Sequence, residues 1–371
     1  MSIAKIDRRA VLGAGAALGT TGLAAPALAQ TKRFRMVTSW APELPILPDS
    51  AQRVADQITL LSGGGLTFEV VHAGPDTHGE FDVLDLVRTG RADAYHSLEQ
   101  NWQDRHPAYA FFTTVPFGLT ADEMASWLRF GGGDTLWQEL ANSNSVHPML
   151  VGNTSCQMGG WFAEKVESLE QLNGKKISIP GIGGKVWQAA GLDTQSLAGA
   201  DLIPALFEGK IDALEWFNPH LDLDFGFAKL LPFYMFPGWQ EPGDALAMGI
   251  NLGRFEQLTP EEKALIEVAC QQESVRVTGE FLAENGRSLN IMRREYGAQL
   301  EAFPPELLDR LFELTDQVLE EIAGHDELAG RIHGSFLDFR NATARYSDIS
   351  SGKFVSLRNA ALGLDKVYKY R

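Results

Sequence analysis

Two stretches of the sequence, "TGRADAYHS" (89–97) and "EGKIDALEW" (208–216), share one pattern. Each has a glycine, a basic residue, an apolar residue and Asp-Ala, followed by residues typical of a short strand. A glycine at this place suits the left-handed position that ends many helices. The pattern therefore predicts two similar helix-turn-strand units, although such a common motif can also occur twice by chance.

The two units place His96 and Glu215 at equivalent strand ends. Ligands of open α/β sheets bind beyond the carboxyl ends of the strands. If the two units face each other, both residues are expected to look into one cleft. Glu215 is followed by Trp216 and Phe217, and a charged group among aromatic side chains is costly to bury unless something pairs with it. We therefore expect a partner for Glu215 in the cleft.

The rest of the chain predicts an α/β protein in which helices and strands alternate. The length of 371 residues favours two domains. We expect the first domain at 30–152 plus about 244–280, and the second at 153–243. Strands are predicted at "RFRMVTSW" (33–40), "LTFEVVHAG" (66–74) and "ALAMGINLG" (245–253).

No further strand is predicted after these. Thr259-Pro260-Glu261-Glu262 is a strong helix start, with an N-cap, a proline at the first position and a glutamate at the third. The helix is expected to run to about Arg294. Apolar residues at helical spacing follow Pro305, and a last helix is expected from Arg331 to Tyr346. Residues 281–371 are thus predicted to be helices that brace the domains and could join two chains.

The N-terminus has the features of an export signal. Arg8 and Arg9 precede the apolar run "AVLGAGAALGTTGLAAPALA" (10–29), which ends in a small-residue cleavage site. The arginine pair favours the twin-arginine route. We therefore expect residues 1–29 to be removed and the mature protein to reside in the periplasm; the alternative is a membrane anchor.

Removal of this segment would take away Lys5, Arg8, Arg9 and Asp7 and change the net charge from −16 to −18. So negative a surface repels nucleic acid and anionic lipid, which argues against both as partners. The two cysteines, Cys156 and Cys270, permit either a disulfide bridge or two free thiols.

The sequence offers no evident catalytic constellation. It contains no H-E-x-x-H zinc pair and no G-x-S-x-G elbow, and "SIPGIGGKV" (178–186) fits neither nucleotide-binding glycine pattern. The stretch "GNTSCQMGGWF" (152–162) instead gathers amides and hydroxyls beside an aromatic residue, which suits a small polar ligand. The alternative is a surface loop with exposed amides.

Six motifs in this order resemble the solute-binding proteins of TRAP transporters (DctP type), in the branch that binds α-keto acids. That resemblance covers essentially the whole mature chain. It implies a type II-like periplasmic-binding-protein fold with a cleft between two domains, and a role without catalysis: capture of a solute for delivery to a membrane permease. The motifs are "FFTTVPFGLTADEMASWL" (111–128), "GNTSCQMGGWF" (152–162), "LNGKKISIPGIGG" (172–184), "IDALEWFNP" (211–219), "FPGWQEPG" (236–243) and "SFLDFR" (335–340).

The resemblance also implies a sodium ion, or another hard cation, between protein and solute. Its protein ligands would be the amide of Gln157, the carboxylate of Glu215 and the carbonyl of Trp216. Hard oxygen ligands suit such an ion, which would be the expected partner of Glu215. The branch contains dimers joined through C-terminal helices, so a homodimer is possible here.

The chain departs from the family where the solute would be held. Ser178 replaces the arginine that grips the solute carboxylate, and Gln100 and Asn101 replace a tyrosine pair. We therefore expect a solute rich in hydroxyl, carbonyl or amide groups, and weak binding of pyruvate, unless Lys185 or Arg129 supplies the missing charge. The predicted solute contacts are Gln100, Asn101, Asn153, Gln157, Ser178, Glu215, Trp216, Asn218, His220 and Glu241.

Two other functions fit the same cleft. The protein could present a ligand to a membrane receptor as a sensor, or it could be an exported enzyme with Glu215 as general base. The enzyme is less favoured because no acid partner or nucleophile lies near Glu215 in the sequence.

Overall fold

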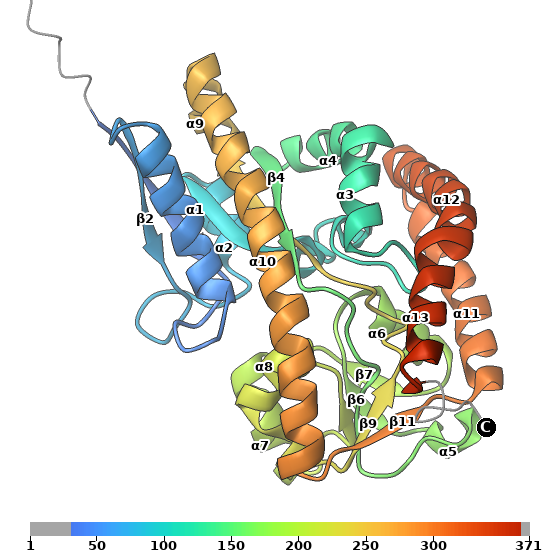
Figure 1. Cartoon of the computed structure of the whole chain (residues 1–371). Coiled ribbons are helices and arrows are strands. Elements are labelled where there is room, and N and C mark those ends of the chain that lie inside the picture. Colours follow the sequence, from blue (N-terminus) through green and yellow to red (C-terminus); the bar gives the residue numbers. More distant parts are fainter. Residues whose placement is uncertain (1–30, 365–371) are drawn as a thin grey trace, which may run out of the picture.

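The computed structural model describes residues 31–364 as two β-sheets surrounded by helices (Figure 1). The predicted export signal lies outside the described residues. The expected mixed α/β class is confirmed, with strands and helices alternating along most of the chain.

The first sheet has the strand order β2-β1-β3-β10-β4. Strand β1 pairs in parallel with β2 and β3, whereas β10 runs antiparallel between β3 and β4. Because β10 comes late in the sequence, the chain returns to this sheet after building the second one. The strands are β1 (Lys32–Thr38), β2 (Leu66–Val71), β3 (Ala94–Leu98), β4 (Val146–Asn153) and β10 (Ala245–Asn251).

The second sheet has the order β11-β9-β5-β8-β6-β7. Its short strands β6 and β8 are parallel, so their carboxyl ends meet at one edge. The strands are β5 (Gly160–Phe162), β6 (Lys176–Ser178), β7 (Asp193–Gln195), β8 (Ala213–Leu214), β9 (Phe233–Phe236) and β11 (Gln299–Ala302).

Helices fill the connections between these strands and cover the sheets. Their apolar faces are buried; in α1, for example, Val54, Ala55 and Ile58 are fully inside. These helices are α1 (Leu47–Leu61), α2 (Val83–Arg88), η1 (Glu99–Trp102), η2 (Pro107–Phe112), α3 (Ala121–Phe130), α4 (Gly133–Asn142), α5 (Leu169–Leu172), α6 (Gly181–Ala189), α7 (Gly199–Phe207), α8 (Pro219–Phe225), η3 (Phe227–Lys229) and α9 (Leu252–Glu256).

Two segments, residues 154–159 and 237–244, carry the chain between the sheets and lie side by side. The Thr154 N–H donates to the Asp244 carbonyl at 3.0 Å, and the Gln157 N–H donates to the Glu241 carbonyl at 3.2 Å. The Thr154 hydroxyl accepts from the Asp244 N–H at 3.0 Å. The two crossing segments thus form one hydrogen-bonded pair between the sheets.

The helix α10 (Pro260–Glu295) passes along both sheets (Figure 1). It starts with the predicted capping box, in which Thr259 and Glu262 satisfy each other's backbone N–H groups. Along its length it packs against α1, β4 and α8, and Arg53 on α1 donates to Glu273 at 3.0 Å. One helix therefore braces both halves of the fold.

The expectation that no strand follows was wrong. Strand β11 (Gln299–Ala302) pairs in parallel with β9 and extends the second sheet by one strand. The segment "QLEA" is too short and too polar to stand out in the sequence; its place at the end of α10 brings it to the sheet edge. Three helices and a π-turn follow: α11 (Pro305–Ala323), α12 (Glu327–Ser347), η4 (Asp348–Gly352) and α13 (Lys353–Ala361).

Cys156 is exposed, Cys270 is buried, and both are free thiols. The two cysteines are therefore not joined by a disulfide bridge. Across residues 31–364, none of the helices combines the length and the apolar character needed to cross a bilayer.

Candidate functional site

A cavity lies between the two sheets, where strands of both sheets end. Residues after β1 and β3 form one wall, and residues at or after β6 and β8 form the other, as expected for an α/β ligand site. Asp244, at the entry to β10, completes it. The lining consists of Ser39, Trp40, Leu44, Glu80, Phe81, Leu98, Gln100, Asn101, Ser178, Pro180, Ser196, Leu197, Glu215, Trp216, Phe217 and Asp244.

Glu215 lies directly after β8, and its N–H donates to the Ser178 carbonyl at 2.9 Å. Only 2% of the residue is exposed. Gly160 lies opposite with a φ of +103°, and a side chain there would approach the Leu214 carbonyl to 2.8 Å. The second glycine of "MGGWF" is therefore required for the close approach that buries Glu215.

Three carboxyl groups meet at this point: Glu215, Glu241 and Asp244. Burial raises the pKa of Glu215 well above its ordinary value, and the neighbouring Asp244 carboxyl raises it further. The pKa of Glu241 is raised for the same two reasons, with Glu215 adding to them. Burial also raises the pKa of Asp244, to about 7. The charged form of each acid is therefore disfavoured unless a positive group pairs with it.

The Gln157 amide is held in place by one of these acids. Its Nε2 donates to Asp244 Oδ2 at 2.6 Å. Five oxygens form no hydrogen bond within residues 31–364: Gln157 Oε1, both carboxyl oxygens of Glu215, Asp244 Oδ1 and Glu241 Oε2. Glu241 and Gln240 nevertheless lie close to the Glu215 carboxyl group. Buried oxygens without donors are rare in folded proteins.

This set of oxygens fits a bound hard cation. Carboxylate and amide oxygens are the donors that such ions prefer, and a cation would offset the cost of burying Glu215. Gln157 and Glu215 would hold it together with the Trp216 carbonyl. The ion would supply a positive charge to which an oxygen of the solute can bind.

No lysine or arginine is among the residues that line the cavity. Ser178 is buried in β6 and its hydroxyl accepts weakly from the Leu197 N–H at 3.4 Å. Lys185 on α6 lies nearest the acids Asp104 and Glu321, and Arg129 pairs with Glu267. Neither cation replaces the missing arginine.

Gln100 and Asn101 lie on the opposite wall, in η1. The Gln100 N–H donates to the Thr113 hydroxyl at 2.8 Å, and Asn101 Nδ2 donates to Ser97 Oγ at 3.3 Å. Gln100 Oε1 lies so close to Gly181 that a Cβ there would be 2.7 Å away. Both amides thus contribute to the cavity wall, and their contact with a solute stays a prediction.

Of the ten predicted solute contacts, five are not among the residues that line the cavity: Asn153, Gln157, Asn218, His220 and Glu241. Asn218 and His220 are engaged in another part of the fold. Asn218 caps α8 by accepting from the His220 and Leu221 N–H groups, and His220 Nδ1 is 3.0 Å from the Ser288 hydroxyl on α10. Neither residue lines the cavity, because the chain turns into α8 directly after Phe217. Their function as solute contacts is therefore corrected to anchoring α8 against α10. Asn153 is buried beside the cavity and accepts from the Ser155 N–H at 2.9 Å.

The expectation for His96 was also wrong. It lies in the middle of β3 and does not line the cavity. Its Nδ1 accepts from the Trp40 indole at 2.8 Å, and burial lowers its pKa to about 3. The two units differ in strand length: β3 continues past His96 to Leu98, whereas β8 ends at Leu214. After β3, the residues that line the cavity are Gln100 and Asn101.

Several residues that line the cavity were not predicted from the sequence. Trp40 and Glu80 come from loops after β1 and β2, for which no motif gave a signal. Asp244 directly follows "QEPG", so a second acid three residues after Glu241 was a visible signal. Asp244 was not recognised because it joins the site only when the two crossing segments lie side by side.

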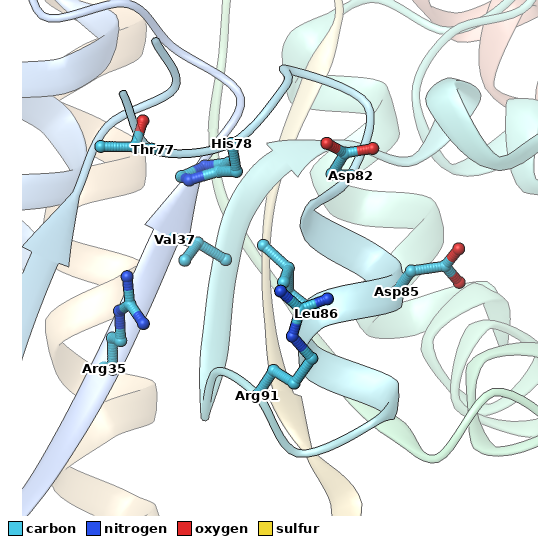
Figure 2. A pocket seen from close by; sticks show the side chains of 8 residues that line it. All are labelled: Arg35, Val37, Thr77, His78, Asp82, Asp85, Leu86 and Arg91. Atoms are coloured by element: carbon cyan, nitrogen blue, oxygen red, sulfur yellow. The ribbon is translucent and has the colours of Figure 1, made fainter. Parts of the chain in front are cut away.

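A second hollow lies outside this site, between β1 and α2, and is lined by Arg35, Arg91, Asp82 and Asp85, among others (Figure 2). Asp85 is paired with Arg88 at 2.5 Å and with Arg105 at 2.6 Å. None of the predicted site residues lines this hollow, and its acids need no cation from a ligand.

A third candidate is the group formed by His106, His325 and Asp326, whose ligand atoms lie within 4.8 Å of one another. His106 Nδ1 accepts from the Ala108 N–H, so the ring proton lies on Nε2, which is 2.9 Å from Asp326 Oδ2. That nitrogen already has a partner. The group is explained as a hydrogen bond that fixes the start of α12.

Residues 36–326 match the protein family described as "Bacterial extracellular solute-binding protein, family 7" (DctP). The chain belongs to this family. It is 32% identical over 327 residues to a monocarboxylate 2-oxoacid-binding periplasmic protein of Nostoc sp., with 87% of this chain and 89% of the relative covered.

Solved structures of TRAP periplasmic solute-binding proteins have the same fold. The protein of Pseudoalteromonas atlantica, with bound sodium and pyruvate, is 30% identical with a TM-score of 0.84, covering 88% of this chain and 99% of that one. The protein of Colwellia psychrerythraea, with bound calcium and pyruvate, is 29% identical with a TM-score of 0.85 and the same coverage. This family 7 member is accordingly a TRAP solute-binding receptor, and the predicted family is confirmed.

Glu99, at the start of η1, provides a test of buried charge next to the site. Its Oε1 accepts from the Tyr95 hydroxyl at 2.5 Å, and burial raises its pKa from 4.5 to about 7. The folded state thus holds this proton more tightly than the unfolded state. The resulting stability is present below about pH 4.5 and is lost as the pH rises through 7.

We expect Glu99→Gln to remove this loss of stability at rising pH. Between pH 5 and pH 8, the free energy of unfolding of the unmodified protein should fall by roughly 2 kcal/mol more than that of the variant. Urea denaturation at both pH values measures the difference. Equal pH dependence of the two proteins would show that Glu99 is ionised without penalty.

Proposed function

We propose that this receptor captures a small polar organic solute in the cavity between the two sheets, through a cation held by Gln157, Glu215 and Trp216. The observation that carries the proposal is the pair of buried Glu215 oxygens, which have no donor among residues 31–364. The sodium, calcium and pyruvate bound in the solved structures of relatives support an ion shared between protein and solute.

The solute would meet mostly neutral groups apart from the ion. Gln100 and Asn101 supply amides, and Ser178 supplies a hydroxyl, whereas no basic side chain lines the cavity. We propose a solute whose hydroxyl, carbonyl or amide groups pair with these, and whose carboxylate, where it has one, binds the ion. Mass spectrometry of the molecule that co-purifies with the protein, combined with elemental analysis for the ion, tests the proposal directly.

The receptor is proposed to act without catalysis, to bind in the periplasm and to deliver its solute to TRAP permease subunits. Incubation with the identified solute should return it unchanged, which separates this function from an enzyme that uses Glu215 as general base. The two sheets would form the cores of the two domains predicted at 30–152 with 244–280 and at 153–243. The crossing segments at 154–159 and 237–244 would be the place where the domains move relative to each other.

Export by the twin-arginine route is proposed from Arg8 and Arg9. Replacement of both by lysine is expected to leave uncleaved precursor in the cytoplasm, because that route reads the arginine pair itself and not only its charge. Cell fractionation with immunoblotting measures the outcome. Processing that continues at the normal level in the double variant would argue for another export route.

A homodimer is proposed through the C-terminal helices. The C-terminal segment from the end of α12 to just past α13 exposes several large apolar side chains: Tyr346 70%, Ile349 72%, Phe354 64%, Leu357 69% and Leu362 67%. Phe354→Glu with Leu357→Glu should convert the protein from dimer to monomer, as measured by light scattering after gel filtration. Phe207→Glu, at an equally exposed site on α7, is the matched control. A monomeric unmodified protein would contradict the proposal.

A further inference from the structure

The buried acid Asp244 is not among the residues that the family resemblance assigns to the ion. It lines the cavity and is 1% exposed. Both of its backbone polar groups are fixed by Thr154, at 3.0 Å each. Its Oδ2 accepts from Gln157 at 2.6 Å, while Oδ1 has no donor among the described residues. One carboxylate oxygen is thus engaged, and the other is available beside an ion ligand.

The charge of the site distinguishes between a monovalent and a divalent ion. Glu215 and Asp244 are both buried, Glu241 lies against them, and no lysine or arginine lines the cavity. Charges inside a protein interact far more strongly than in water, so an uncompensated carboxylate is costly. Of these three acids, Glu215 and Asp244 line the cavity. A single positive charge offsets one of them, and two positive charges offset both.

We propose that Asp244 coordinates the ion together with Glu215 and Gln157, and that this second carboxylate makes the site selective for a divalent hard cation over sodium. The proposal rests on the ion site of the proposed function and specifies its charge. Calcium fits better than magnesium, because calcium accepts six to eight oxygen ligands in flexible geometry, whereas magnesium keeps several waters.

The test measures ion binding without any solute. Protein stripped with a chelator is titrated with Tb³⁺, a calcium substitute whose luminescence is excited through a nearby tryptophan; Trp216 lines the cavity. Ca²⁺ is expected to displace Tb³⁺ at concentrations at least about 100-fold lower than Na⁺ does, because the site holds two carboxylates. Displacement by Na⁺ and Ca²⁺ at equal concentrations would overturn the proposal.

Asp244→Asn tests the residue itself. It keeps the shape and one oxygen but removes the charge, so affinity for Tb³⁺ and Ca²⁺ should fall by about 30-fold or more. Glu99→Gln removes a buried carboxyl group that does not line the cavity. This variant should change the affinity for Tb³⁺ and Ca²⁺ by less than about threefold. Unchanged Ca²⁺ affinity in a folded Asp244→Asn variant would contradict the assignment. If that variant does not fold, the ion preference of the unmodified protein decides.

Failure of the proposed function would look different. One such outcome is tight binding of Ca²⁺ while no solute is found by mass spectrometry or by equilibrium dialysis. That result would support the ion site and contradict the receptor assignment. A protein that binds solute with sodium as well as with calcium would retain the receptor function and lose the inference about Asp244.

Discussion

Glu215→Gln is expected to lower the affinity for the co-purifying solute by about 30-fold or more, equivalent to about 2 kcal/mol. The substitution preserves size and one oxygen but removes the charge that balances the cation. Because the residue is 2% exposed, water cannot replace it, and the ion would be left in the cavity without its main partner. The ion and the solute should therefore be lost together.

Isothermal titration of the solute in calcium, in sodium and in chelator measures this effect. In the unmodified protein, chelator should weaken binding as strongly as the substitution does, and in the Glu215→Gln variant it should add little. Glu99→Gln is the matched control, because it removes a carboxylate that is also buried but does not line the cavity. Solute binding that survives both the substitution and the chelator would eliminate the ion-mediated mechanism.

Ser178→Arg is expected to change what the receptor binds. Unmodified protein should bind pyruvate weakly in sodium, since a charge-assisted contact to a buried anion contributes about 2–5 kcal/mol and the cavity has no basic group. An arginine at this position on β6 would present two parallel donors to a carboxylate. Pyruvate affinity should rise by at least about 30-fold, while the co-purifying solute, which has to share the space with the new side chain, should bind less tightly.

Ser178→Gln is the matched control, because it adds length and an amide without the charge. The gain in pyruvate binding should be confined to the arginine variant. Tight binding of pyruvate by the unmodified protein in sodium would show that the ion alone holds the carboxylate. The family's ordinary ligand would then apply here as well.

The local sequence was sufficient to predict several elements. The capping box at Thr259 to Glu262 begins α10 at the predicted residue, and the glycine at position 90 has the left-handed φ of +72° that was expected. Helix α11 begins at Pro305, where apolar residues at helical spacing were noted, and buries Leu311, Leu314 and Val318. These features depend on hydrogen bonds and side-chain spacing within a few residues, so their physical causes are contained in the segment itself.

The candidate site was only partly predictable. Glu215 stood out because a carboxylate among aromatics needs a partner, and the resemblance added Gln157 and Trp216. His96 and His220 were assigned to the cleft because the sequence does not show where a strand stops or a helix turns away. Asp244 was missed because its significance arises from Thr154 and Gln157, which lie far away in the sequence and meet it only through the paired crossing segments.

The sequence by itself determined the α/β class, the long bracing helix and a carboxylate among aromatic residues that needs a partner. The tertiary structure decided which acids meet, that no lysine or arginine among residues 31–364 lines their cavity, and that "QLEA" becomes a strand. The physical reason is the separation, along the chain, of the residues that interact. Helix caps and apolar periodicity act between neighbours in the chain, whereas burial, charge compensation and strand pairing depend on groups brought together from distant segments.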